Sequence, residues 1–99
     1  MSGWHLYIIR NRLGQLYTGI STDPARRFEE HQSGGNKAAK ALKGKGPLQQ
    51  VYCAQVGDRS QATKAEMAVK KLTRAQKQAL IGGLIALPLT ESEADRTKQ

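Results

Sequence analysis

The sequence predicts an α+β fold in which a three-stranded, mostly antiparallel sheet is flanked by helices, in the order β-β-α-β-α-α. Two short segments rich in Tyr, Ile and Trp lie on either side of a turn, which is typical of a hairpin. Later segments begin at helix-capping residues and end at glycines. Because 99 residues can bury only one modest core, we expect a single domain over residues 1–89 and a polar, disordered tail over 90–99.

The strands are expected from composition and from the turns between them. The first two should span residues 4–10 and 15–21, joined by a turn that ends at Gly14. A loop at 34–47, rich in Gly and Lys, separates them from a third strand at 48–56. The sheet is therefore expected to contain one hairpin and one later strand.

The helices are expected from the residues that cap their ends. Asp23, followed by a proline, predicts the start of a helix that runs to about Ser33. Ser60 can cap a second helix, whose apolar residues recur at helical spacing. Residues 73–76 have the form of a capping box, so a third helix is expected to start there and to end at Gly82.

Charge is the composition feature that says most about partners. Sixteen Lys and Arg against eight Asp and Glu give a net charge of +8, which favours a polyanion, with nucleic acid first and an anionic membrane second. A basic protein that is merely soluble has the same composition. The side chains expected to contact the nucleic-acid backbone are Lys37, Lys40, Lys43, Lys45 and, on the second helix, Lys70.

Several function classes have no sequence signature in this chain. It has no Walker-type loop, no Cys/His zinc pattern and no apolar run of bilayer length, and Cys53 is its only cysteine. We therefore expect a cytoplasmic monomer that binds neither membrane nor a small-molecule cofactor.

Two tyrosines and a glycine in the hairpin could form a phosphate site. Tyr7 and Tyr17 face the same side if the register pairs odd positions with odd ones, and Gly19 then lies on that face too. A bare strand glycine allows a ligand such as a phosphate to approach the backbone. The alternative is structural, because tyrosine favours strands and glycine can mark a bulge.

Charged side chains on two helices are further candidates. Arg27 and His31 share one helix face, where a guanidinium can clamp a phosphate and an imidazole can relay a proton. Glu66 is a lone carboxylate in a basic helix and could hold one Mg²⁺. The alternatives are ordinary ion pairs, between Arg27 and Glu30 and between Glu66 and Lys70.

The tripeptides His5-Leu6-Tyr7 and Tyr17-Thr18-Gly19 resemble the paired tripeptides of the GIY-YIG nuclease superfamily. The resemblance covers about residues 4–75, and the segments at 6–10 and 56–60 are similar to the small stand-alone bacterial group called YhbQ-like. Further positions follow in order at the spacing of that family. The resemblance implies that the catalytic residues are Tyr7, Tyr17, Arg27, His31 and Glu66.

What the resemblance implies is hydrolysis of nucleic-acid phosphodiesters, with DNA favoured over RNA and little sequence specificity. Tyr7 would act as general base, with its proton passed on through Tyr17 or His31. Arg27 would hold the scissile phosphate, and Glu66 would bind one divalent cation, Mg²⁺ or Mn²⁺. A second function class fits the same residues: a non-catalytic nucleic-acid-binding module on this fold.

Overall fold

Three antiparallel strands form the centre of the computed structural model, which describes residues 3–35, 38–40 and 42–88. Strand β1 (Trp4–Arg10) lies between β2 (Leu16–Ser21) and β3 (Gln49–Gly57), so the sheet order is β2-β1-β3. Both pairings are antiparallel. The α+β fold class and the order β-β-α-β-α-α predicted from the sequence are confirmed.

The first helix, α1 (Pro24–Ser33), is delimited as predicted. The Asp23 carboxylate accepts a hydrogen bond from the Arg26 backbone N–H at 3.1 Å, which satisfies one of the free donors of the first turn. The helix ends at Gly34, whose left-handed conformation (φ 72°) strongly favours glycine.

The second helix, α2 (Arg59–Lys70), begins two residues earlier than a cap at Ser60 would allow, and the prediction that Ser60 caps it is wrong. Asp58 is the cap: its carboxylate accepts from the Gln61 N–H at 2.8 Å, and the Gln61 side chain accepts from the Asp58 N–H at 3.0 Å. Helix α3 (Arg74–Ile81) starts with the predicted capping box formed by Thr73 and Gln76.

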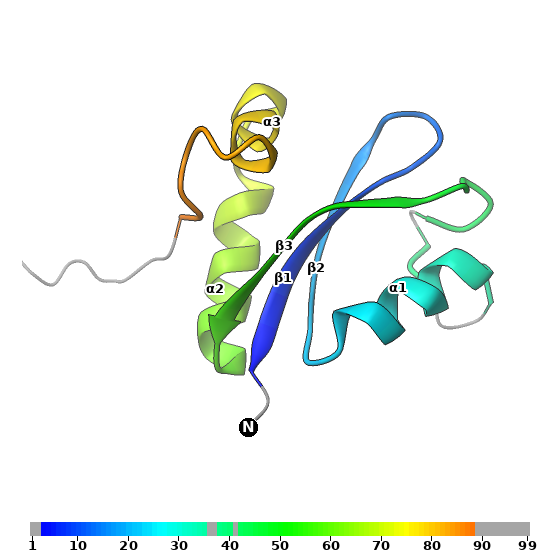
Figure 1. Ribbon diagram of the computed structural model, residues 1–99, viewed down its shortest axis with the longest axis horizontal. Coiled ribbons are helices and arrows are strands. Elements are labelled where there is room, and N and C mark those ends of the chain that lie inside the picture. Colours follow the sequence, from blue (N-terminus) through cyan, green and yellow to red (C-terminus); the bar gives the residue numbers. More distant parts are fainter. Residues whose placement is uncertain (1–2, 36–37, 41, 89–99) are drawn as a thin grey trace, which may run out of the picture.

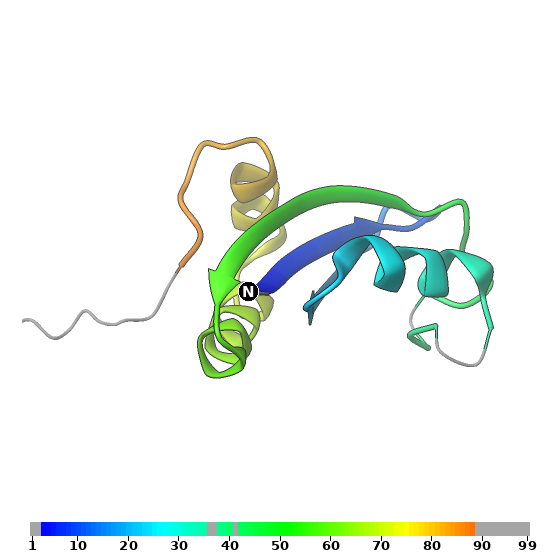
Figure 2. The ribbon, with the colours of Figure 1, turned by 60° about the horizontal axis from the view of Figure 1, so that its bottom comes forward.

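The helices cover opposite faces of the sheet. Figures 1 and 2 show α1 on one side of the strands and the α2–α3 pair on the other. Leu6 and Ile8 on β1 pack with Val69 of α2 and Leu80 of α3. On the opposite face, Tyr7 and Ile9 form a second cluster near α1. Its other buried members are Leu42 and Leu48, and the partly buried Phe28 packs against it. Successive side chains of β1 point to opposite faces of the sheet and thus contribute to two separate hydrophobic clusters. Among the described residues, no helix has the length and apolar character needed to cross a bilayer.

Candidate active site

Register places both hairpin tyrosines on the face that α1 covers. Tyr7 pairs with Gly19 and Ile9 pairs with Tyr17, so odd positions pair with odd ones as the phosphate-site hypothesis required. A one-residue slip would have moved Tyr17 to the opposite face. Strand pairing alone therefore brings the two phenols to the same side of the sheet.

Gly19 makes room for the Tyr7 ring. Tyr7 is 2% exposed, and a Cβ atom added at Gly19 would lie 2.5 Å from the Tyr7 Oη and 2.6 Å from its Cζ. Such distances are shorter than van der Waals contact. The Tyr7 phenol therefore packs directly against the backbone of Gly19 on β2. The space that the sequence suggested for an approaching phosphate is filled by that ring.

Gly19→Ala should destabilise the protein by about 1–3 kcal/mol, the usual cost of overpacking a core. The Tyr7 ring is buried and hydrogen-bonded at its oxygen, so it has little freedom to yield. Gly35→Ala is the matched control, because among the described residues a Cβ there would meet only the Ser33 Oγ, at 3.8 Å. Chemical denaturation measures both variants. Equal stability of the two would contradict the seating role of Gly19.

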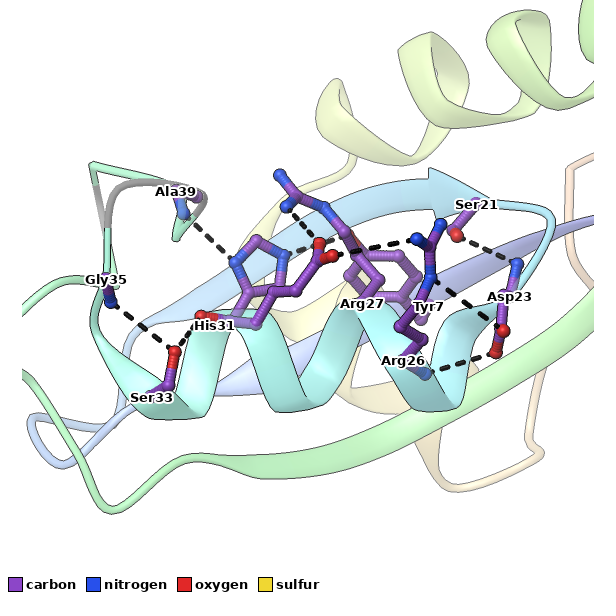
Figure 3. Close-up of polar contacts among 10 residues, drawn as sticks. Tyr7, Ser21, Asp23, Arg26, Arg27, His31, Ser33, Gly35 and Ala39 are labelled. Carbon is purple, nitrogen blue, oxygen red and sulfur yellow. Dashed lines mark hydrogen bonds and ion pairs between the residues drawn. The ribbon is translucent and has the colours of Figure 1, made fainter.

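His31 is held on both ring nitrogens, as Figure 3 shows. It is 1% exposed; its Nδ1 lies 3.0 Å from the Ala39 backbone nitrogen, and its Nε2 lies 3.1 Å from the Tyr7 Oη. A backbone N–H can only donate, so Nδ1 must accept and the proton of the neutral ring is on Nε2. His31 therefore donates to the Tyr7 oxygen. Sequence reasoning missed Ala39, since a backbone donor leaves no side-chain signal.

The surroundings of His31 keep it neutral. Burial lowers the pKa of His31 below its usual 6.5, and the positive charge of Arg27 lowers it further, while Glu30 opposes the shift. A second proton would have to go on Nδ1, where it would face the Ala39 N–H. The ring is therefore arranged to donate to Tyr7 and is poorly placed to take up a proton.

Stability should therefore depend on pH through His31. A base whose pKa is lower in the folded protein stabilises the fold fully above its unfolded-state pKa of about 6.5, and less as the pH falls below that value. Between about pH 7.5 and about pH 5.5, the wild type should lose more free energy of unfolding than His31→Gln does. Urea denaturation at both pH values measures this, and identical losses would exclude the effect.

Arg27 lies beside the same phenol and is also ion-paired. Its Nη1 donates to the Glu30 Oε1 at 2.9 Å, so the Arg27–Glu30 ion pair that the sequence suggested is present. The same guanidinium acts on Tyr7 through its charge and a hydrogen bond, both of which lower the pKa of that phenol. Arg26 is farther from Glu30, at 3.9 Å, and also contacts Asp23 (Figure 3). Glu30 thus orients Arg27 without removing it from the site.

Tyr17 completes the tyrosine pair next to His31. Its ring meets the His31 imidazole edge-on, with 5.6 Å between centroids, whereas the Tyr7 and His31 rings are tilted and 6.0 Å apart. Tyr17 is partly exposed, in contrast to the buried Tyr7. The outer phenol is therefore the one that a ligand can touch directly.

Glu66 lies on α2, the helix that covers the other face of the sheet, and its charge still acts on the Tyr7 phenol. Helix α2 packs against β1 and against β2, the edge strand over which the Tyr7 phenol lies. The carboxylate is partly exposed and near enough that its charge raises the pKa of Tyr7. The Lys70 Nζ lies 3.2 Å from the Glu66 Oε2, so the ion pair that the sequence suggested for these two residues is present. The charge effect on Tyr7 is the link between Glu66 and the residues that α1 contributes.

The proton on Tyr7 is held tightly. Burial raises the pKa of Tyr7 to about 12, with a smaller effect in the same direction from the charge of Tyr17, while Arg27 lowers it and Glu66 raises it. The phenol is therefore protonated at neutral pH. An added cation beside Glu66 would oppose these effects and favour the phenolate.

A divalent cation fits the donor chemistry of Glu66. Within 3–35, 38–40 and 42–88, no group of three or more His, Cys, Asp or Glu could enclose a metal ion, so a protein-built cage is not found there. Mg²⁺ commonly binds through one or two carboxylates, with water and substrate phosphate as its other ligands. Glu66 offers one partly exposed carboxylate of this kind.

The lysines predicted to contact nucleic acid differ in their exposure. Lys40 and Lys43 are exposed, Lys45 is half-buried, and Lys37 lies outside the described residues. The Lys45 carbonyl accepts a hydrogen bond from the Arg12 N–H at 2.8 Å, which ties the lysine segment to the β1–β2 turn. Lys70 is 54% exposed despite its pairing with Glu66. Of these lysines, Lys45 shares the lining of one cavity with Tyr17, and Lys40 and Lys43 are open to solvent.

Comparisons with known proteins find a matching family model and similar curated proteins. Residues 3–79 match the model of the GIY-YIG catalytic domain. The chain is 56% identical over 81 residues to the UPF0213 protein YhbQ of Escherichia coli K12, covering 82% of this chain and 79% of that one. It is 50% identical over 92 residues to a UPF0213 protein of Cronobacter sakazakii, covering 93% and 95%.

Two structures solved by solution NMR are also similar. One is a UPF0213 protein of Bacillus halodurans, 35% identical with a TM-score of 0.52, covering 81% of this chain and 83% of that one. The other is a protein of E. faecalis, 38% identical with a TM-score of 0.56, covering 84% and 85%.

Proposed function

The chain belongs to the GIY-YIG family of nucleases, and on that premise we propose that it is a metal-dependent endonuclease that hydrolyses nucleic-acid phosphodiesters. DNA is favoured over RNA, with little sequence specificity. The observation that carries this proposal is the position of the Tyr7 oxygen, which His31 contacts at 3.1 Å and on which Arg27 and Glu66 both act.

Tyr7 is proposed as the general base. Its oxygen accepts from the His31 Nε2–H, and the Arg27 guanidinium lies beside it, so both neighbours stabilise a phenolate. General-base catalysis requires that the base be within hydrogen-bond reach of the proton that it removes, here a proton of the attacking water. The tautomer of His31 makes it a donor that positions Tyr7, and the proton leaves by way of the more exposed Tyr17 or solvent.

Arg27 is proposed to hold the scissile phosphate. A guanidinium remains charged at any working pH and can bind two phosphate oxygens at once. Glu30 fixes one edge of the group through the 2.9 Å contact and thereby limits its rotamers. Charge that builds on the phosphate during attack is then offset by a cation already in position.

Glu66 is proposed to bind one Mg²⁺ or Mn²⁺. Such an ion, when bound, supplies positive charge for the leaving oxygen. Lys70, now paired with the carboxylate, is flexible and half exposed, so it can turn to the nucleic-acid backbone when the cation takes its place.

Incubation of the protein with single-stranded, duplex and branched DNA, and with RNA, tests the proposal. Nicking that requires Mg²⁺ or Mn²⁺ and stops with a chelator supports the enzyme. Binding that weakens with salt, without cleavage under any of these conditions, supports the second candidate, a non-catalytic binding module. The buried Tyr7, with its pKa of about 12, and the Glu66–Lys70 pair are the features that favour this alternative.

Replacing loop lysines should reduce the salt dependence of binding. Each Lys that neutralises a phosphate contributes about 0.9 to the slope of log affinity against log salt. Lys40→Ala combined with Lys43→Ala should therefore reduce that slope by about two, with Lys64→Ala combined with Lys71→Ala on α2 as the charge-matched control. Fluorescence anisotropy at several salt concentrations measures it. Equal slopes for both double variants would exclude the loop as the contact surface.

A further inference from the structure

A cavity of about 320 Å³ lies beside Tyr17, and its lining does not include Tyr7, Arg27, His31 or Glu66. It lies between the β1–β2 turn and the segment that carries Leu42 and Lys45. This volume is at the small end of the range for ligand pockets, about 300–1,000 Å³, so it suits one ring system and not a whole cofactor. Its walls are formed by Asn11, Gln15, Leu16, Tyr17, Leu42 and Lys45.

One wall of this cavity is rigid. Asn11 is 6% exposed, and its Oδ1 accepts from the Leu13 and Gln15 backbone N–H groups at 2.9 and 3.0 Å. Its Nδ2 donates to the Gln15 Oε1 at 2.9 Å. All the amide atoms of Asn11 are thus used within the turn, and they fix the orientation of the neighbouring Gln15 amide.

The lining suits a planar ring that carries hydrogen-bond acceptors. Leu42, 1% exposed, supplies an aliphatic surface, and Tyr17 supplies an aromatic ring on which a base can stack. Among the residues that the structure describes, the Gln15 Nε2 has no hydrogen-bond acceptor, while its Oε1 is engaged by Asn11. Glutamine amides and lysine ammonium groups are common readers of base edges.

Tyr17 connects this cavity to the proposed phosphate site. The same ring that lines the cavity meets His31 edge-on at 5.6 Å, and His31 is hydrogen-bonded to Tyr7. A nucleotide bound beside Tyr17 can therefore direct its base either to solvent or past that ring into the cavity. Burying one face of a base on Leu42 favours the second position.

We propose that this cavity binds the base of the nucleotide next to the scissile phosphate, unstacked from its neighbours. The proposal rests on the phosphate site of the proposed function and assigns to it a neighbouring base subsite. The donor of Gln15 and the cation of Lys45 would favour bases that present ring-nitrogen or carbonyl acceptors toward the turn.

Ligand-observed and protein-observed NMR without metal tests this subsite directly. The probes are 2′-deoxyadenosine 5′-monophosphate and 2-deoxyribose 5-phosphate, which differ only by the base. Both should shift the signals of Arg27 and His31, which report phosphate binding. Only the nucleotide should shift the Gln15 side-chain amide and the Leu42 methyl groups, with the same saturation curve as His31.

Variants separate base contact from general damage. Gln15→Ala should weaken binding of the nucleotide about 2- to 10-fold, as expected for the loss of one hydrogen bond. Binding of the sugar phosphate should be unchanged. Gln55→Ala, at the opposite end of the sheet, is the matched control and should alter neither ligand.

The two proposals fail in different ways. Identical Gln15 and Leu42 shifts with both probes, or none with the nucleotide, would overturn the base subsite while Arg27 and His31 still report a phosphate site. Loss of the Arg27 and His31 responses would count against the phosphate site itself.

Discussion

Glu66→Gln should reduce metal-dependent cleavage by about 100- to 1,000-fold, the usual loss when one group that stabilises transition-state charge is removed. The amide keeps the shape of the side chain but binds a divalent cation poorly. Because the loop lysines and Arg27 are unchanged, affinity for the nucleic acid should remain within a few-fold of the wild type in chelator. Single-turnover cleavage and anisotropy measure the two quantities on the same substrate.

Glu29→Gln is the control, since it makes the same chemical change on an exposed position of α1. It should leave the cleavage rate unchanged. If Glu66→Gln cleaved as fast as Glu29→Gln at the same Mg²⁺ concentration, Glu66 would be no more than the partner of Lys70, with which it pairs at 3.2 Å.

Tyr7→Phe should reduce the cleavage rate by about 100- to 10,000-fold, the range that general acid–base catalysis contributes. Phenylalanine preserves the ring that fills the space over Gly19 and removes only the oxygen that exchanges a proton. The His31 Nε2–H then loses its acceptor, so a stability cost of about 1–3 kcal/mol is also expected. Cleavage is therefore measured well below the melting temperature of the variant.

Tyr52→Phe provides the matched comparison. Tyr52 lies on β3 and packs with the cluster on the opposite face of the sheet, away from His31. The Tyr52→Phe variant should cleave at the wild-type rate. A Tyr7→Phe enzyme that kept the full rate would leave Tyr7 as a packing residue and would require a different base.

The backbone arrangement was largely accessible from the sequence because its signals are local. The Tyr, Ile and Trp content of 4–10, the Asp23 cap and the Thr73 capping box each act over a few residues, and the structure confirms all three elements. The cap of α2 was misassigned to Ser60, although Asp58 and Gln61 stand at capping-box spacing; a serine near a helix start is a weaker signal than that reciprocal pair.

The internal geometry of the site depends on contacts between distant segments, and these were not predictable. That Gly19 seats Tyr7 depends on the direction of a phenol across a neighbouring strand, which periodicity does not specify. The tautomer of His31 is fixed by the Ala39 N–H, eight positions away in a loop. Pairings predicted as alternatives to function, Arg27 with Glu30 and Glu66 with Lys70, coexist with the site, because local helical spacing permits both.

Titration with Mn²⁺, a paramagnetic stand-in for Mg²⁺, tests most directly whether a cation on α2 lies beside the tyrosine centre. The signals of Tyr7, Tyr17, Arg27 and His31 should broaden together with those of Glu66, and Glu66→Gln should abolish the effect at the same Mn²⁺ concentration. Broadening confined to α2, with Tyr7 and His31 unaffected, would contradict a shared site for the metal and the base.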